Sequence, residues 1–242
     1  MVLVAAAVGL ILGSFANVLI HRLPREESIV WPGSRCPSCK APIRPTDNIP
    51  ILSFLSLRGR CRDCGARISL RYPLVEALMA AAAAAVWWAM PDLLSRIAGV
   101  IFAFLLIVIT FIDLDVQLIL NRLTYPGVAV GLAFAFLAGR GLPALASAVG
   151  AAALIAAIVV ASRGGMGGGD VKLAAMMGAF LGWPGVAVAL FAGFLIGGLF
   201  GVVLLALKLK GRKDAIPFGP ALAAGGLIAL FWGEAIARWY WP

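Results

Sequence analysis

The chain has 242 residues, of which 62% are hydrophobic and 13% charged, and its mean hydropathy is +1.01. A soluble domain of this length cannot bury so much apolar surface, so the composition excludes a soluble globular protein. The net charge of +9 does not indicate a nucleic-acid partner, because the basic residues lie in short connections between apolar stretches and form no continuous stripe.

Apolar stretches recur from end to end, and most approach the ~20 residues with which a helix crosses a bilayer. None alternates polar and apolar residues as a transmembrane β-strand would. The sequence therefore predicts an all-α integral membrane protein, a polytopic bundle of about eight transmembrane helices. The predicted helices cover residues 2–20, 72–90, 94–112, 124–139, 142–161, 171–183, 185–207 and 216–238.

The first and the shortest of these segments each lead to a further expectation. No basic residue precedes residues 2–20, so we expect a retained helix and not a cleaved signal. Residues 171–183 form the shortest segment. A helix of ~12 residues covers only about 18 Å, which is less than the thickness of the hydrocarbon layer. We expect this segment to tilt, to start deep in the membrane or to be re-entrant.

Lys and Arg predict the orientation, because they accumulate in cytoplasmic loops. With the N-terminus in the periplasm, seventeen of the twenty lie in cytoplasmic connections, ten of them between residues 22 and 71. We therefore expect a multi-pass inner-membrane protein with a periplasmic N-terminus. The predicted parts are a first transmembrane helix (residues 1–20), a cytoplasmic loop domain (residues 21–71) and a transmembrane domain (residues 72–242).

The loop domain contains two C-x-x-C knuckles, Cys36-Pro-Ser-Cys39 and Cys61-Arg-Asp-Cys64, which are 21 residues apart. Four thiolates at this spacing suit a tetrahedral Zn²⁺, and Gly65 allows the tight turn that a knuckle needs. The sequence predicts a zinc-ribbon-like site with four cysteine ligands. We expect a structural ion, since four thiolates leave no open position for a water. The alternative, a redox pair, lacks a surrounding βαβ pattern.

Two acidic positions lie beside predicted membrane segments, where ionisable groups are costly and usually functional. Asp113 lies just beyond residue 112, at the end of the third predicted helix, and Asp170 precedes the sixth. Two carboxylates in one partly desolvated site share a proton, so that one activates water for attack on a peptide carbonyl. This is the aspartic peptidase arrangement. The alternative is structural: Asp113 or Asp115 caps a helix end, and Asp170 caps the start of the next helix or pairs with Lys172.

The run of glycines before Asp170 permits close approach of the backbone to another helix or to an extended substrate. Gly167, Gly168 and Gly169 make up this run. A phosphate-binding loop is not indicated, because the G-x-x-x-x-G-K-[ST] pattern is missing.

Several motifs, in this order, resemble those of the bacterial type IV prepilin peptidases, and the resemblance covers nearly the whole chain. The motifs are Gly13-Ser14-Phe15-Ala16-Asn17-Val18, His21-Arg22-Leu23-Pro24, Asp47-Asn48-Ile49-Pro50, Leu57-Arg58-Gly59-Arg60, Arg71-Tyr72-Pro73-Leu74-Val75-Glu76, Phe111-Ile112-Asp113-Leu114-Asp115, Gly167-x-Gly169-Asp170 and Ile216-Pro217-Phe218-Gly219-Pro220. One stretch departs from the pattern: the family usually reads Leu-Pro-Asp where this chain has Ile119-Leu120-Asn121.

The resemblance implies an aspartic endopeptidase with Asp113 and Asp170 as its catalytic pair. It implies removal of the basic leader of prepilins and pseudopilins at the cytoplasmic membrane face. N-methylation of the new N-terminus with S-adenosylmethionine is expected to follow. As weaker candidates for substrate contacts we name Gly167, Gly169, Lys172 and Glu76.

Glu76 lies just inside the second predicted helix, where it either pairs with an arginine of the loop domain or serves the methylation site. The expected partners of the protein are its pilin substrates and the lipid bilayer, and no nucleic acid. Two alternatives remain at this point. One is a peptidase without methyltransferase activity, and the other is a transporter whose carboxylates bind cations or protons.

Overall fold

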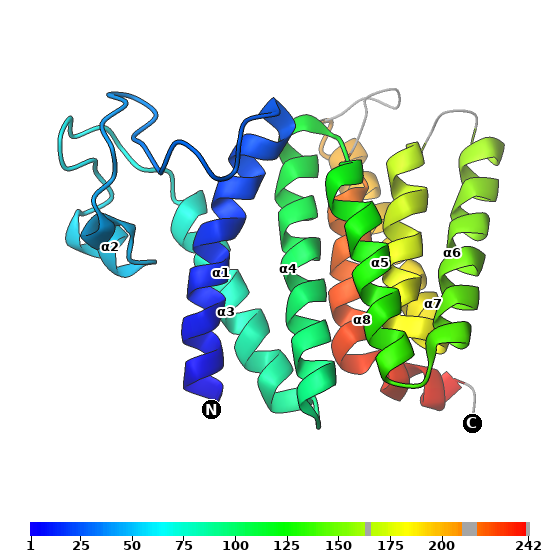
Figure 1. Cartoon of the computed structure of the whole chain (residues 1–242). Coiled ribbons are helices and arrows are strands. Elements are labelled where there is room, and N and C mark those ends of the chain that lie inside the picture. Colours follow the sequence, from blue (N-terminus) through cyan, green and yellow to red (C-terminus); the bar gives the residue numbers. More distant parts are fainter. Residues whose placement is uncertain (163–165, 210–216, 241–242) are drawn as a thin grey trace. The chain divides into compact units, whose positions relative to one another are not determined.

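The computed structural model describes residues 1–162, 166–209 and 217–240, in which the named elements are all helices, joined by a long loop region between the first two long helices and by shorter connections elsewhere (Figure 1). It divides into two compact units, Met1–Met90 and Pro91–Pro242. The first unit contains α1 (Val2–Arg22), α2 (Leu52–Ser56), α3 (Arg71–Ala89) and two 3₁₀ turns, Leu23–Arg25 and Pro45–Asn48. The second contains α4 (Leu93–Val116), α5 (Asn121–Leu137), α6 (Gly141–Ala161), α7 (Gly168–Ala206) and α8 (Gly219–Tyr240).

The predicted helical membrane protein is confirmed. Six helices, α1, α3, α4, α6, α7 and α8, are long and apolar enough to cross a bilayer. The remaining long helix, α5, has 17 residues and is slightly shorter. The predicted segments correspond to the seven long helices, two of them lying within α7. The predicted start of the last helix, residue 216, lies outside the described residues.

In the first unit, α1 packs against α3 through small residues, as is common between membrane helices. A Cβ atom on Gly9 would lie 2.7 Å from the Cα of Ala80, so only glycine allows this approach. Near the other end of α1, the side-chain amide of Asn17 donates to the backbone oxygen of Tyr72 over 3.1 Å. The helix pair therefore fixes the N-terminal end of α3.

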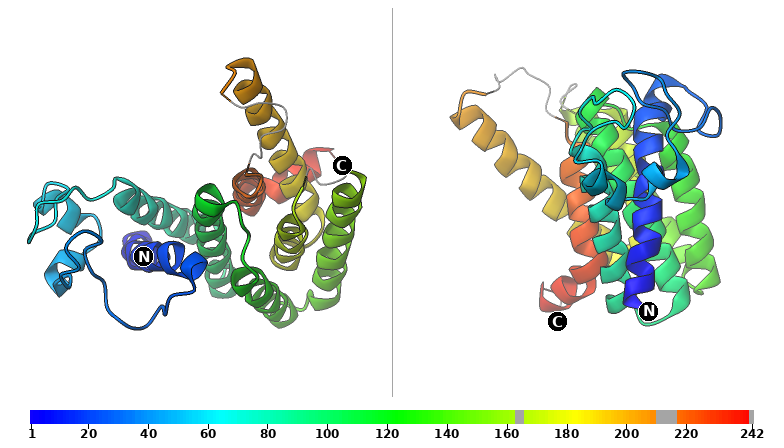
Figure 2. Two further views of the ribbon diagram at one scale, coloured as in Figure 1. Left: turned by 90° about the horizontal axis from the view of Figure 1, so that it is seen from above. Right: turned by 90° about the vertical axis from the view of Figure 1, so that its left-hand side faces the viewer.

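In the second unit, α7 contacts α5, α6 and α8, while α4 contacts α5 and α8. Seen from above, α5, α6 and the first part of α7 lie side by side (Figure 2). The largest fully buried side chains of this unit come from four of its helices and include Phe102, Leu106, Ile155, Met176 and Leu222. The core of the second unit therefore surrounds α7.

A break divides α7 near its middle. Gly182 has φ 64° and ψ −173°, and Trp183 has φ −90° and ψ 137°, so neither residue is helical. Pro184 follows and has no N–H with which to continue the helical hydrogen bonds. The second part of α7, coloured gold, projects from the rest of the second unit in both views of Figure 2.

Candidate active site and metal centre

Asp113 lies in the last turn of α4, which continues to Val116 instead of ending at residue 112 as predicted. The residue is only 5% exposed. The backbone N–H of Gly219, the first residue of α8, donates to Asp113 Oδ2 over 2.9 Å. Asp115, two positions later, is exposed, so the two acidic residues of this motif face different surroundings.

Asp170 lies in the first turn of α7 and is also 5% exposed. The backbone N–H of Gly167 donates to Asp170 Oδ2 over 3.0 Å, and the N–H of Asp170 donates back to the Gly167 oxygen over 3.1 Å. The Asp170 carboxylate thus caps the start of its own helix. It does not pair with Lys172, whose partner lies on another helix.

The two carboxylates come from α4 and α7, which contact one another within the second unit. Each uses its Oδ2 atom to accept a backbone N–H, and no hydrogen bond to either Oδ1 atom is found among the described residues. The pair can therefore present oxygen atoms to water or to a substrate.

The three glycines before Asp170 differ in their surroundings. A Cβ atom on Gly169 would lie 2.8 Å from the Cβ of Ile119, whereas one on Gly168 would meet nothing within 4 Å. A Cβ atom on Gly167 would have the Asp170 Oδ2 as its nearest neighbour, at 3.7 Å. A glycine is therefore needed at position 169, because the backbone there lies close to Ile119 in the connection between α4 and α5.

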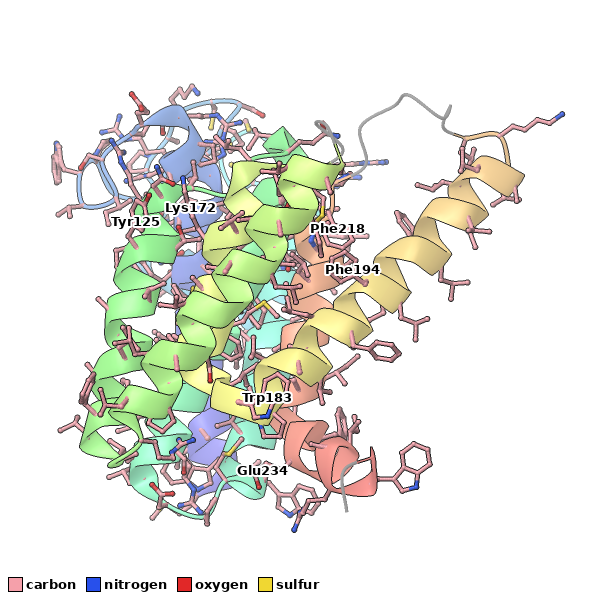
Figure 3. All side chains as sticks on the ribbon, turned by 90° about the vertical axis from the view of Figure 1, so that its right-hand side faces the viewer. Tyr125, Lys172, Trp183, Phe194, Phe218 and Glu234 are labelled. Carbon is pink, nitrogen blue, oxygen red and sulfur yellow. The ribbon has the colours of Figure 1, made fainter. Side chains whose placement is uncertain are left out.

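Lys172 joins the starts of α5 and α7. Its Nζ donates to the Asn121 side-chain oxygen over 2.7 Å and lies 5.5 Å from the centre of the Tyr125 ring (Figure 3). Asn121 is the position at which the resembled family usually has aspartate. In this chain the contact between these two helix starts is a hydrogen bond to a neutral amide.

Glu76 belongs to the first unit and is 8% exposed. Its Oε2 atom accepts the N–H of Ile51 over 2.8 Å. The expectation of an arginine partner is wrong: among the described residues its partner is this backbone N–H, because the loop folds Ile51 back onto the start of α3. A Cβ atom on Gly13 would lie 2.6 Å from the Glu76 Cα, so α1 packs closely against α3 at Glu76.

The four cysteines are free thiols, and their Sγ atoms all lie within 4.8 Å of one another. The Sγ atoms of Cys36 and Cys64 are 3.9 Å apart. A tetrahedral Zn²⁺ with bonds of about 2.3 Å requires S···S distances of about 3.8 Å. The cluster therefore has the donor set and the spacing to hold a tetrahedral metal ion.

The two knuckles have the same backbone pattern. The N–H of Cys36 donates to the Ala41 oxygen, and the N–H of Cys61 donates to the Ala66 oxygen. The residue after each knuckle, Lys40 or Gly65, has a positive φ. The value of 70° at Gly65 agrees with the tight turn predicted there. A hydrogen bond from the Cys39 backbone is the largest of the causes that lower the pKa of the Cys36 thiol to about 6, whereas desolvation and the neighbouring thiols raise the pKa of Cys39 to about 12.

An ion pair links the segment between the knuckles to the second knuckle. Arg62 Nε and Nη2 donate to the two carboxylate oxygens of Asp47 over 2.8 and 2.6 Å. This bidentate contact holds the pKa of Asp47 below its ordinary value. This ion pair is therefore a second contact, besides the cysteine cluster, that connects distant parts of the loop.

Sequence reasoning missed one residue of the site. Gly219 was noted only as part of a motif, with no role, although its N–H contacts Asp113. The two residues are 106 positions apart, so no local signal could have joined them.

The fold and the site together define a polytopic helical membrane protein with two buried carboxylates in one unit and a four-cysteine cluster in the other. Two family models cover most of the chain. Residues 7–90 match the bacterial peptidase A24 N-terminal domain, and residues 100–202 match the type IV leader peptidase family.

Curated relatives agree with these matches over nearly the full length. A protein of Aeromonas hydrophila is 39% identical over 262 residues, covering 96% of this chain and 90% of the relative. A Bacillus subtilis protein is 38% identical, covering 96% and 94%, and a Pseudomonas aeruginosa protein is 35% identical, covering 99% and 93%. Each is named a prepilin leader peptidase/N-methyltransferase. No solved structure matches.

This chain belongs to the type IV leader peptidase family, and the resemblance inferred from its motifs is confirmed.

Proposed function

We propose that this protein is a membrane aspartic endopeptidase that removes the basic leader of type IV prepilins and pseudopilins. Asp113 and Asp170 are its catalytic pair. The observation that carries the proposal is that two buried carboxylates lie on contacting helices, α4 and α7, of one unit. Membership of the family favours this function over the transporter considered above.

The chemistry follows from two carboxylates that share a proton. The ionised member takes a proton from water as the water oxygen attacks the peptide carbonyl carbon, and the protonated member gives its proton to the carbonyl oxygen. When the intermediate collapses, the C–N bond breaks, the leaving amine takes a proton from the first carboxyl group and the second regains its own. Because the pair titrates as a unit, neither role is assigned to one residue.

The second activity proposed is N-methylation of the new N-terminus, with Glu76 as a binding residue. S-adenosylmethionine supplies the methyl group. The buried Glu76 carboxylate is bound by one backbone N–H and by no cation among the described residues, so it fits a cationic group such as the substrate ammonium. It would accept the ammonium proton and so free the nitrogen lone pair for methyl transfer.

In this proposal the four cysteines hold a structural Zn²⁺ that stabilises a cytoplasmic loop too small to have a core of its own. The N-terminus lies in the periplasm, and the active site faces the cytoplasm of an inner-membrane protein. The ten basic residues between positions 22 and 71 support this orientation. Pilin substrates and the bilayer are the partners, and nucleic acid is not one.

Cleavage of a purified prepilin in detergent tests the peptidase assignment. Asp113→Asn and Asp170→Asn should each lower the rate by on the order of 10²- to 10⁴-fold, while the exposed Asp115→Asn should retain activity. Circular dichroism and gel filtration would establish that each variant is folded. Retained cleavage by either buried variant would show that the pair is wrongly assigned, and ion flux without cleavage would favour a transporter.

Labelled S-adenosylmethionine tests the methylation assignment on a pilin peptide that is already cleaved. Glu76→Gln should lose methyl incorporation and retain cleavage, whereas the exposed Glu26→Gln should lose neither. Absence of incorporation by the wild type would leave a peptidase alone. Normal incorporation by Glu76→Gln would remove Glu76 from the site.

A further inference from the structure

We propose that Gly219 is a positioning residue for Asp113, and that the start of α8 thereby aligns one half of the catalytic pair. This inference rests on the proposed peptidase function. The two carboxylates are held in different ways. Asp170 is fixed by Gly167, three residues before it, whereas Asp113 is fixed by a residue on another helix.

The N–H of Gly219 is available because of its place in the helix. The first N–H groups of a helix have no acceptor within it. At the start of α8, the N–H groups of Ala221 and Leu222 both donate to the Phe218 oxygen, and Pro220 has none. The Gly219 N–H points instead at Asp113, where the positive end of the helix dipole also favours a carboxylate.

Glycine is required at this position for steric reasons. A Cβ atom on residue 219 would lie 2.7 Å from Asp113 Oδ2, 3.0 Å from its Cγ and 3.3 Å from its Cβ. All three contacts fall on the same side chain. Even alanine would therefore force the carboxylate to turn, and this rotation would break the hydrogen bond that holds it.

The neighbouring residue fixes the start of α8 itself. Phe218 packs against Phe194 of the second part of α7, with ring centres 5.2 Å apart (Figure 3). A Cβ atom on Gly197 would lie only 2.4 Å from the Phe218 ring, so the glycine makes room for this ring. The contacts thus run from α7 through Phe218 and Gly219 to Asp113.

Steady-state cleavage of a prepilin by Gly219→Ala tests the inference. Because a displacement of about 1 Å at a reacting group can lower a rate by 10²-fold, we expect kcat to fall by on the order of 10²-fold with little change in KM. The pH dependence of kcat should also change, since Asp113 loses its hydrogen-bond donor. Methylation of an already cleaved pilin peptide should remain at the wild-type rate.

Gly233→Ala is the matched control on the same helix. Its new Cβ would lie 3.5 Å from its nearest neighbours, an ordinary contact distance, so cleavage should be unchanged. If Gly219→Ala does not fold, Phe218→Leu replaces it. That variant keeps the glycine and its N–H but loosens the start of α8, and we expect a smaller fall in kcat at unchanged KM.

The outcomes separate this inference from the proposed function. If Asp113→Asn is inactive but folded Gly219→Ala has the kcat and pH profile of the wild type, the positioning role is wrong and the peptidase assignment stands. A wild-type kcat for Phe218→Leu would also contradict the inference. If Asp113→Asn itself cleaves normally, the proposed catalytic pair is wrong.

Discussion

Two adjacent glycines at the start of α7, Gly168 and Gly169, should respond differently to substitution by alanine. In Gly169→Ala the new Cβ would lie 2.8 Å from the Cβ of Ile119, where carbon atoms normally lie about 3.5 to 4.0 Å apart. Relief of this overlap requires a shift of about 1 Å. Overpacking of this kind costs about 1–3 kcal/mol of folding free energy.

The same shift should reach the active site, because the next residue is Asp170. A displacement of about 1 Å would lower kcat for prepilin cleavage by on the order of 10²-fold. Gly168→Ala is the control, since its Cβ would meet nothing within 4 Å. Alanine is preferred to glycine by about 0.5–1 kcal/mol in the middle of a helix, but Gly168 is the first residue of α7, so Gly168→Ala should be close to neutral.

Thermal unfolding in detergent and steady-state cleavage would measure both effects. A second substitution identifies the cause. Ile119→Ala retains the Cβ atom responsible for the overlap and should not rescue Gly169→Ala, whereas Ile119→Gly removes that atom and should restore part of the activity. Equal behaviour of the two glycine variants, or rescue by Ile119→Ala, would refute the steric reasoning.

Two further predictions concern the metal cluster and the contact between α5 and α7. Removal of zinc with a chelator, or Cys36→Ser, should make the loop between α1 and α3 more sensitive to protease while the helical circular dichroism is retained; an unchanged digestion pattern would contradict a structural ion. Asn121→Asp should form an ion pair with Lys172 and raise the free energy of unfolding by up to about 1 kcal/mol, and by less at high salt. Thermal unfolding at low salt should then show a modestly higher melting temperature. No change at low salt would show that a negative charge at residue 121 adds nothing to the contact with Lys172.

Much of this molecule could be predicted from sequence because the relevant signals are local. The apolar stretches are long enough to predict helices that cross a bilayer. The spacing of the two knuckles predicts that the four thiols come together, as they do. The end of α4 was predicted too early, at residue 112. Its apolar run stops there, but Asp113 is buried and the helix continues for another turn.

The hydrogen bond that the Asp170 carboxylate accepts could be predicted from the sequence, because its donor, the Gly167 N–H, is only three residues away. The other partners were not. Asp113 meets Gly219, Gly169 meets Ile119, and Glu76 meets Ile51 only after the segments have packed.

Hydropathy and short motifs therefore determined that the chain spans a membrane in helices, brings four thiols together and has two acidic residues worth testing. They did not determine how each helix is rotated or how far it slides along its neighbour. A rotation or shift of a few ångströms leaves hydropathy unchanged but separates an N–H from its carboxylate, because hydrogen bonds require distances near 3 Å. For this reason only the tertiary structure could place Gly219 beside Asp113.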